Sequence, residues 1–436
     1  MLRKPGGEGD VSDTARLRTV VRECFRSLIT GCSPEQHLPN IPISTRLLNA
    51  FLGPGASGHQ APEQVFKQLL DKATETGGPA DGDDAFLSDF RRLVAEMCST
   101  SGWTALGWQS AVADLQLRLQ NRLRIVRLHR EVPELAAERV VAPIFVATLP
   151  RTATNFTRGV IGRSTHHRAP LLWEMTYTDL LLPERQRRER IKSVTQLYKQ
   201  IGQLAPKYRK AVGLEAEEPD DCAHLLPHGP SHLMRADMPG YRKWLAKRDF
   251  RPDYIRLKQA LQVLQHGRPP ARWVLESPAH LDNLEAIREA FPDAKILWVH
   301  RDPITVLGSL CSLTEISQAM HLRGPDREAI GQNWMEMLAA SIERARRARV
   351  ALPREAIVDV PYPQLAADPR GALPLLYERL GSRWTQNDSG NLEKVLAGPG
   401  IARSHEQELS RYGLTSADVE AAFGDYPRII TGLWLR

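Results

Sequence analysis

The sequence lacks the features that indicate a membrane protein, a secreted protein or a cysteine-based metal site. Its five cysteines are widely spaced, and no Cys-x-x-Cys pair indicates a zinc or redox site. No stretch approaches the roughly 18 consecutive apolar residues that a membrane span needs, and the N-terminus has no apolar segment of a secretion signal. These absences predict reduced thiols, a cytoplasmic location, no metal and no membrane partner.

A strong excess of charge of one sign is also missing. Lys and Arg number 58 against 51 Asp and Glu, which gives a formal net charge of +7 over 436 residues. The densest charged run, residues 184–190, mixes both signs as a solvated helix face does. So mild an excess could mean nucleic acid, a membrane surface or a small anionic ligand, and a slightly basic enzyme that binds no nucleic acid is the favoured interpretation. It leaves the oligomeric state open.

Helical periodicity dominates the first third of the chain. Residues 14–135 have a helical pattern, interrupted by loops rich in glycine and proline at 53–62 and 77–84. Residues 1–13 have the composition of a disordered tail. We therefore predict a helical N-terminal region over residues 1–135.

Short apolar runs take over after about residue 141 and alternate with helical stretches. This alternation is typical of a parallel sheet covered by helices. We predict an α/β domain over 136–436 that contains a P-loop-like parallel sheet and a mainly helical insertion at about 180–265. The expected strands are residues 144–148, 272–277, 295–301 and 356–362.

A polar turn follows the first expected strand, in the segment IFVATLPRTATNF at 144–156. A strand that ends in such a turn and runs into a helix aims backbone N–H groups at one point, which suits phosphate or sulfate. The turn has neither the lysine nor the preceding glycine of a nucleotide-hydrolase P-loop. A kinase-like enzyme that uses ATP and magnesium is therefore disfavoured.

A second candidate anion site follows the third expected strand, in HRDPITVLGSL at 300–310. Arg301 offers a planar, permanently charged donor, and Ser309, eight residues later, offers a hydroxyl. A loop and a helix start would bring both to one phosphate. The alternative is that Arg301 pairs with Asp302 or another acid and that Ser309 only faces a helix.

Together these motifs resemble the sulfotransferases that use 3′-phosphoadenosine 5′-phosphosulfate (PAPS), in the bacterial branch related to protein-tyrosine sulfotransferases. The resemblance covers roughly residues 120–425, and includes WVLESPAHLDNLEAIREAFPDAKILWVHRDP and SRYGLTSADVEAAFGDY. It implies that the 5′-phosphosulfate lies on the first turn and the 3′-phosphate on Arg301 and Ser309. The residues that match the first turn are Pro150, Arg151, Thr152, Ala153, Thr154 and Asn155.

The resemblance also implies transfer of a sulfonate group from PAPS to a hydroxyl of a small-molecule acceptor, whose pocket the 180–265 insertion would shape. A base must take the proton of that hydroxyl. Glu174 is the first candidate, because related enzymes place a catalytic glutamate at about this distance after the turn. The alternative is that Glu174 caps a helix or pairs with Arg168.

Histidines offer further candidates for the base. His166 and His167 come second, since imidazole titrates near neutral pH. His280 and His300 are expected to orient the two ligand loops rather than to transfer protons.

One departure from the family bears directly on activity. Glu276 stands in WVLESP where the family usually has lysine, and a carboxylate there would repel the sulfonate. Arg158 and Arg163, after the turn, are candidate substitutes for the missing cation. Two functions therefore stay open at this point, a PAPS-dependent sulfotransferase and a non-catalytic protein that binds PAPS or its desulfated product PAP.

Overall fold

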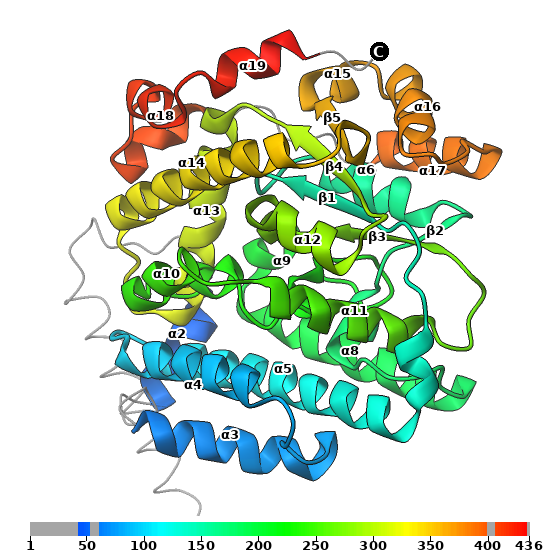
Figure 1. The fold of residues 1–436 in the computed structure, drawn as a ribbon. Coiled ribbons are helices and arrows are strands. Elements are labelled where there is room, and N and C mark those ends of the chain that lie inside the picture. The colour runs from blue at the N-terminus through cyan, green and yellow to red at the C-terminus, as the bar shows by residue number, and fades with distance from the viewer. Residues whose placement is uncertain (1–41, 53–60, 399–405, 434–436) are drawn as a thin grey trace, which may run out of the picture.

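A five-stranded parallel sheet forms the centre of the fold (Figure 1). The computed structural model describes residues 42–52, 61–398 and 406–433, so the predicted N-terminal tail lies outside the described residues. The strand order is β2-β3-β1-β4-β5, with every pair parallel. The strands are β1 (Ile144–Thr148), β2 (His167–Arg168), β3 (Arg272–Glu276), β4 (Lys295–His300) and β5 (Ile357–Pro361).

All four predicted strands are present, each within one residue of the predicted ends. The five residues of β1 are all buried, which explains a continuous apolar run rather than an alternating one. The prediction missed β2, because a two-residue edge strand has no periodic pattern. The predicted fold class, a parallel sheet flanked by helices with a helical N-terminal region, is confirmed.

Each face of the sheet carries its own hydrophobic cluster. Successive residues of β1, such as Ile144 and Phe145, belong to different clusters, because side chains alternate between the two faces of a strand. On one face lie α11 (Arg251–Gln265), α12 (Leu284–Ala290), α13 (Pro303–His321) and α14 (Arg327–Ala351). On the other lie α6 (Thr154–Gly159), α15 (Tyr362–Ala367), α16 (Pro369–Arg379) and α17 (Gln386–Ala397). Both faces are therefore covered, as a parallel sheet requires.

The N-terminal helices pack against the first of these clusters, away from the sheet in Figure 1. They are α2 (Ile43–Leu52), α3 (Pro62–Gly77), α4 (Asp84–Ser99) and α5 (Ala105–Glu131). Phe86, Phe90 and Leu115 belong to the same cluster as Phe145 of β1. The N-terminal region therefore shares its core with the α/β part, and the domain boundary at residue 135 stays a prediction.

The segment between β2 and β3 is mainly helical and lies beside the strand ends. It contains α7 (Leu172–Thr176), α8 (Glu184–Leu204), α9 (Pro206–Val212), α10 (Pro239–Leu245) and α11, with the short turns η5 (Cys222–His224) and η6 (Pro230–Met234). The turns η3 (Pro133–Ala137), η4 (Ile161–Arg163), η7 (Pro278–Asn283), η8 (Arg354–Ala356) and η9 (Glu406–Tyr412) and helices α18 (Ser416–Phe423) and α19 (Tyr426–Gly432) complete the described chain.

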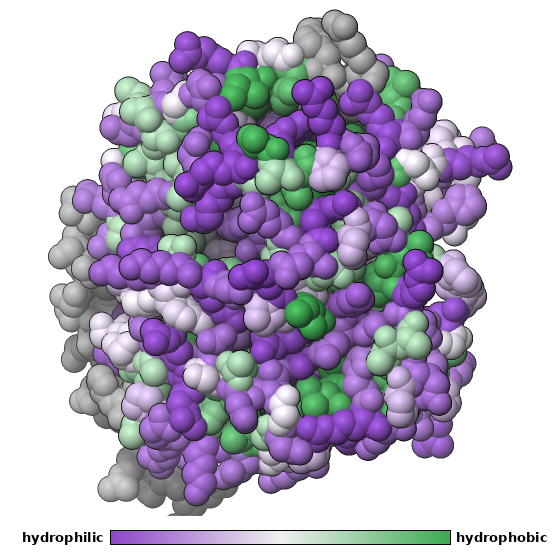
Figure 2. Space-filling model, viewed as in Figure 1, coloured by the Kyte–Doolittle hydropathy of each residue, from purple (hydrophilic) through white to green (hydrophobic). Residues whose placement is uncertain are grey.

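The surface is mixed in character. Figure 2 shows hydrophilic residues over most of the visible face, with apolar residues in small separate groups. Within residues 42–52, 61–398 and 406–433, no helix is both long enough and apolar enough to cross a membrane.

Candidate functional site

The turn between β1 and α6 has an unusual backbone. Arg151 and Ala153 both adopt positive φ angles, of 63° and 55°, a region that non-glycine residues rarely occupy. Thr152 and Ala153 are buried, and the hydroxyl of Thr152 donates to the carbonyl of Pro150 at 3.3 Å. Two left-handed residues within three positions bend the chain sharply at the end of a central strand. Such strain at a strand end marks a candidate ligand site.

Arg301 follows β4 and reaches across to this turn. Its guanidinium donates to the main-chain carbonyl of Arg151 and lies over the ring of Tyr362, 4.7 Å from the centroid. Asp302 instead caps α13, where it accepts from the backbone N–H groups of Ile304 and Thr305. No described carboxylate forms an ion pair with Arg301, so the structure does not adopt the alternative in which Arg301 pairs with an acid.

Arg151 and Ser309 also meet, although 158 positions separate them in the sequence. The Nε of Arg151 donates to the Ser309 hydroxyl at 3.3 Å, and its Nη1 donates to the carbonyl of Ala211 in α9 at 3.1 Å. Partial removal of water and the neighbouring Arg301 lower the pKa of Arg151. The structure therefore brings together Arg151, Arg301 and Ser309, two cations and one hydroxyl.

Glu276, at the end of β3, lies on the other side of the turn and is fully engaged. Its Oε1 accepts from the Thr154 hydroxyl at 2.9 Å, and its Oε2 accepts from Nε of Arg158 at 2.8 Å. Arg158 also pairs with Asp220 at 2.5 Å. Although burial opposes the charge, the carboxylates of Glu276 and Asp220 raise the pKa of Arg158 above its usual range.

Two further candidate residues, Arg163 and Asn155, are not among the described partners of Glu276. Arg163 forms an exposed ion pair with Glu218, so only Arg158 of the two candidate cations meets Glu276. Asn155 is exposed at the start of α6.

Glu174 is buried, 2% exposed, in the first turn of α7. Its Oε1 pairs with Arg168 at 2.6 Å and with Arg268 at 3.1 Å, and its Oε2 accepts from the backbone N–H of Leu171. Glu174 therefore caps a helix and pairs with Arg168, which is the alternative to a catalytic base that we drew from the sequence.

His167 lies away from the turn, and its place among the candidate bases stays a prediction that this position disfavours. It pairs with Arg272 at the start of β3, whereas Glu276 ends that strand, four residues and about 13 Å further along. One ring nitrogen lies 3.0 Å from the Ile161 carbonyl and the other 2.7 Å from the Ser382 hydroxyl. Burial lowers the pKa of His167. Its role is to hold the far end of the sheet.

The other two histidines tie elements together near the strand ends. His280 lies between the thiol of Cys222 at 3.0 Å and the hydroxyl of Tyr254 at 2.8 Å. His300 lies between Asp359 and Tyr426. These contacts are in keeping with the orienting role that we predicted for both.

Two acidic residues that the sequence did not single out lie at the site. Asp220 pairs with Arg158, and Asp221 caps η5 by accepting from the backbone N–H of Ala223. Burial raises the pKa of Asp221 to about 6, even though the nearby Arg158 opposes this. In the sequence, both belong to an acidic loop that looks solvated, and no spacing links them to Glu276.

Comparisons with known proteins agree with this geometry. A family model described as the sulfotransferase family matches residues 143–386, more than half of the chain. The curated protein omega-hydroxy-beta-dihydromenaquinone-9 sulfotransferase Stf3 of Mycobacterium bovis is 26% identical over 109 residues. That match spans 25% of this chain and only 28% of the relative.

Solved structures extend the similarity to most of the chain. Sulfotransferase STF1 from Mycobacterium tuberculosis aligns with a TM-score of 0.72 and 26% identity, over 82% of this chain and 98% of that one. Sulfotransferase STF9 from Mycobacterium avium aligns with a TM-score of 0.75 and 24% identity, over 84% and 96% of the two chains, and shows the same fold. The resemblance to bacterial sulfotransferases is confirmed, and a relation to protein-tyrosine sulfotransferases stays a prediction.

Proposed function

The chain belongs to the sulfotransferase family, and from this premise we propose that it transfers a sulfonate group from PAPS to a hydroxyl of a small-molecule acceptor. The observation that carries the proposal is the contact between Arg301 and the turn that presents Arg151. No described carboxylate pairs with either guanidinium, and like charges held this close repel each other unless an anion lies between them.

The two cations fit a donor with anionic groups at both ends. We assign the 5′-phosphosulfate to the turn, where Arg151, Thr152, Ala153, Thr154 and Asn155 lie, and the 3′-phosphate to Arg301 and Ser309. The hydrogen bond from Arg151 to Ser309 supports this assignment, because it makes the two anion sites adjacent. When bound, PAPS supplies the sulfonate group, and its phosphate leaves with the electrons of the broken S–O bond.

Arg158 is the proposed replacement for the lysine that the family usually has at position 276. Its Nε and Nη1 are held by Glu276 and Asp220, which fixes the guanidinium beside Thr154. A guanidinium has five N–H donors, so two carboxylates do not use them all. Glu276 is then a positioning residue, and the repulsion expected from its carboxylate is offset by the cation that it holds.

Two carboxyl groups are candidates for taking the proton of the acceptor hydroxyl. Glu174 stays a proposal that requires its release from Arg168 and Arg268. Asp221 requires no such release, and its pKa of about 6 suits a base near neutral pH. We therefore favour Asp221. A transfer rate that falls at least about tenfold in D221N but not in E174Q supports this choice, and the reverse result assigns the base to Glu174.

The acceptor is proposed to be a small molecule, in keeping with the hydroxylated quinone that the name of Stf3 states for that protein. The carbonyl of Ala211 in α9 accepts from Arg151, so the helical insertion reaches the turn and is placed to shape the acceptor pocket. A cytoplasmic location stays a prediction of the sequence.

Titration calorimetry with PAP tests the proposal, followed by an assay of sulfonate transfer from PAPS to a panel of phenols and alcohols. We expect PAP to bind and at least one hydroxyl compound to be sulfonated. The proposal is wrong if the purified protein binds neither PAPS nor PAP.

A non-catalytic protein that binds PAPS or PAP is the second candidate, and the carboxylate of Glu276 in place of the family's usual lysine favours it. The variant E276K separates the two functions. Transfer that appears only in E276K means that the natural chain binds without reacting, whereas transfer by the natural chain itself rejects this candidate.

A further inference from the structure

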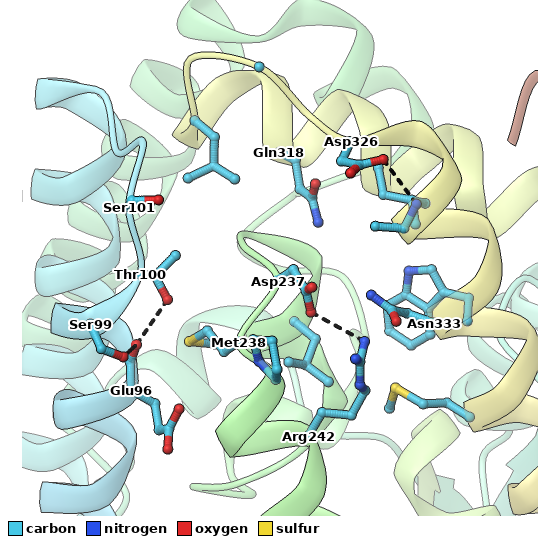
Figure 3. Close-up of a pocket in the computed structure, with 18 residues that line it drawn as sticks. Glu96, Ser99, Thr100, Ser101, Asp237, Met238, Arg242, Gln318, Asp326 and Asn333 are labelled. Atoms are coloured by element: carbon cyan, nitrogen blue, oxygen red, sulfur yellow. Dashed lines mark hydrogen bonds and ion pairs between the residues drawn. The ribbon is translucent and has the colours of Figure 1, made fainter.

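A cavity of about 380 Å³ lies apart from the anion turn, between α4, α10 and the start of α14 (Figure 3). Its lining does not include Arg151, Arg301, Ser309 or Glu276. A volume of this size is within the range of small-molecule sites in proteins. The function proposed above gives this cavity no role.

The cavity presents polar side chains that lack protein partners. Gln318 of α13 is only 4% exposed, and Figure 3 shows its amide and that of Asn333 directed into the cavity. Across the described parts of the chain, neither amide has a hydrogen-bond partner, and the same holds for the indole N–H of Trp334, another lining residue. Gln318 is itself a buried residue whose amide is directed into the cavity without a described protein partner, so it indicates a polar group that a ligand satisfies.

The charge of the lining is negative. Glu96, Asp237 and Asp326 contribute three carboxylates against the single guanidinium of Arg242. Arg242 pairs with Asp237 at 3.2 Å, and Asp326 caps α14 by accepting from the N–H of Ala329. Glu96 has no cationic partner within the described residues. The cavity therefore repels anions such as PAPS and attracts cations.

We infer that this cavity binds a small organic cation, an ammonium group carried on an apolar body. The ammonium would donate to the carboxylate of Glu96, while the amides of Gln318 and Asn333, which lie across the cavity from Glu96 in Figure 3, would contact the other end of the ligand. Met238, Leu322 and Met337 supply an apolar lining for the rest of the ligand.

This site is separate from sulfonate transfer. A second cavity, lined by Thr148, Leu149 and Pro150 before the turn, shares Trp334 and Met337 with the large one. Its volume of about 30 Å³ leaves room for about one or two waters. This second cavity is too small to hold the ligand, and the inference does not depend on the proposed function.

Three probes of similar size test the charge preference on the full chain: phenethylamine, 2-phenylethanol and 3-phenylpropanoate. We expect calorimetry to show the amine binding at least about tenfold more tightly than the alcohol and the acid, with an affinity that falls as salt is added. Saturating PAP should change the affinity for the amine by less than about twofold, since the two sites are separate.

Variants locate the site. E96Q should weaken amine binding by about tenfold and leave the alcohol unaffected, and Q318L should weaken both. E328Q is the matched control, because Glu328 is an exposed acid of α14 outside the lining, and it should change nothing. The inference is overturned if no probe binds, if the alcohol binds as well as the amine, or if E96Q and Q318L bind the amine as the natural protein does. Thermal denaturation of each variant confirms that it is folded.

Discussion

The two sides of the β1–α6 turn handle charge in opposite ways. On the β4 side, Arg301 and Arg151 lie together without a carboxylate partner among the described residues. On the β3 side, Arg158 is held between Glu276 and Asp220. The first side is available to an anion from outside the protein, whereas the second is neutralised by the protein itself.

This difference separates binding from chemistry. An uncompensated pair of cations provides affinity for any anion of the right shape, because no internal ion pair must first be broken. A cation already held by two carboxylates gives up little energy to a ligand but has a fixed position. We therefore expect the β4 side to dominate binding of the nucleotide, and the β3 side to decide whether the sulfonate is transferred.

The largest effect is expected for R158M, on stability. Removing the guanidinium leaves Glu276 and Asp220 as buried charges without their partner, which should lower the free energy of unfolding by about 3 kcal/mol. Urea denaturation measures this. R163M is the matched control, since the exposed pair of Arg163 with Glu218 should contribute no more than about 1 kcal/mol. Equal losses in the two variants would mean that the β3 side is not an internally neutralised network.

The variant R301A should remove one of the two cations on the β4 side and so weaken binding of the nucleotide. Loss of one charge-assisted contact to a phosphate is expected to weaken PAP binding roughly a hundredfold, or about 2.7 kcal/mol. Titration calorimetry measures the affinity. R354A, which removes an exposed arginine far along the chain, should bind PAP normally. Unchanged binding in R301A would remove the 3′-phosphate assignment.

The variant D221N tests the charge balance near Arg158 through the pH dependence of the free energy of unfolding. A folded-state pKa of about 6 lies above the usual value near 3.9, so the folded protein holds an extra proton between these values and loses stability as the pH rises through that window. Asparagine does not titrate and can still cap η5. We expect D221N to be about 1–2 kcal/mol more stable than the natural protein at pH 7 and similar to it at pH 4. Denaturation at both pH values checks this, and a constant difference would place the raised pKa elsewhere.

The smallest effect is expected for A153G, at the turn that both sides share. Alanine at a φ of 55° destabilises the folded protein by about 1–2 kcal/mol, and glycine removes this strain. Glycine also gives the unfolded chain more conformational freedom, which offsets part of the gain in stability. The variant should be stabilised by about 0.5 kcal/mol, as measured by thermal denaturation. A421G, within the exposed face of helix α18, should instead be destabilised by about 1 kcal/mol. Destabilisation of A153G would show that the alanine methyl packs favourably in the turn.

Local patterns predicted the sheet and placed two candidate anion-binding segments after its strands. Strand β1 is an unbroken apolar run that ends in a polar turn, and Arg301 ends another such run, so parallel pairing of the two strands brings both turns to one edge. Ser309 follows by helical spacing from Arg301 within the same segment. The partners of Glu276 could not be predicted in this way, because Asp220 lies in an acidic loop whose path depends on packing of the helical insertion.

The base illustrates the same limit. The family resemblance favoured Glu174, whose buried carboxylate is bound to Arg168 and Arg268 in the fold. Asp221 carries no motif, and its burial beside η5, together with the nearby charge of Glu276, raises its pKa. Whether a carboxylate is an ion-pair partner or a base depends on its neighbours in space.

The sequence by itself determined the parallel sheet and placed the polar turn and the segment with Arg301 and Ser309 after strands, because each depends on periodicity or on residues close together in the chain. Only the tertiary structure decided how the charge of Glu276 is balanced, which carboxylates are held in ion pairs and where the acidic cavity lies. Those features depend on side chains from distant segments, and electrostatic interactions fall off with distance in space, whatever the separation along the chain.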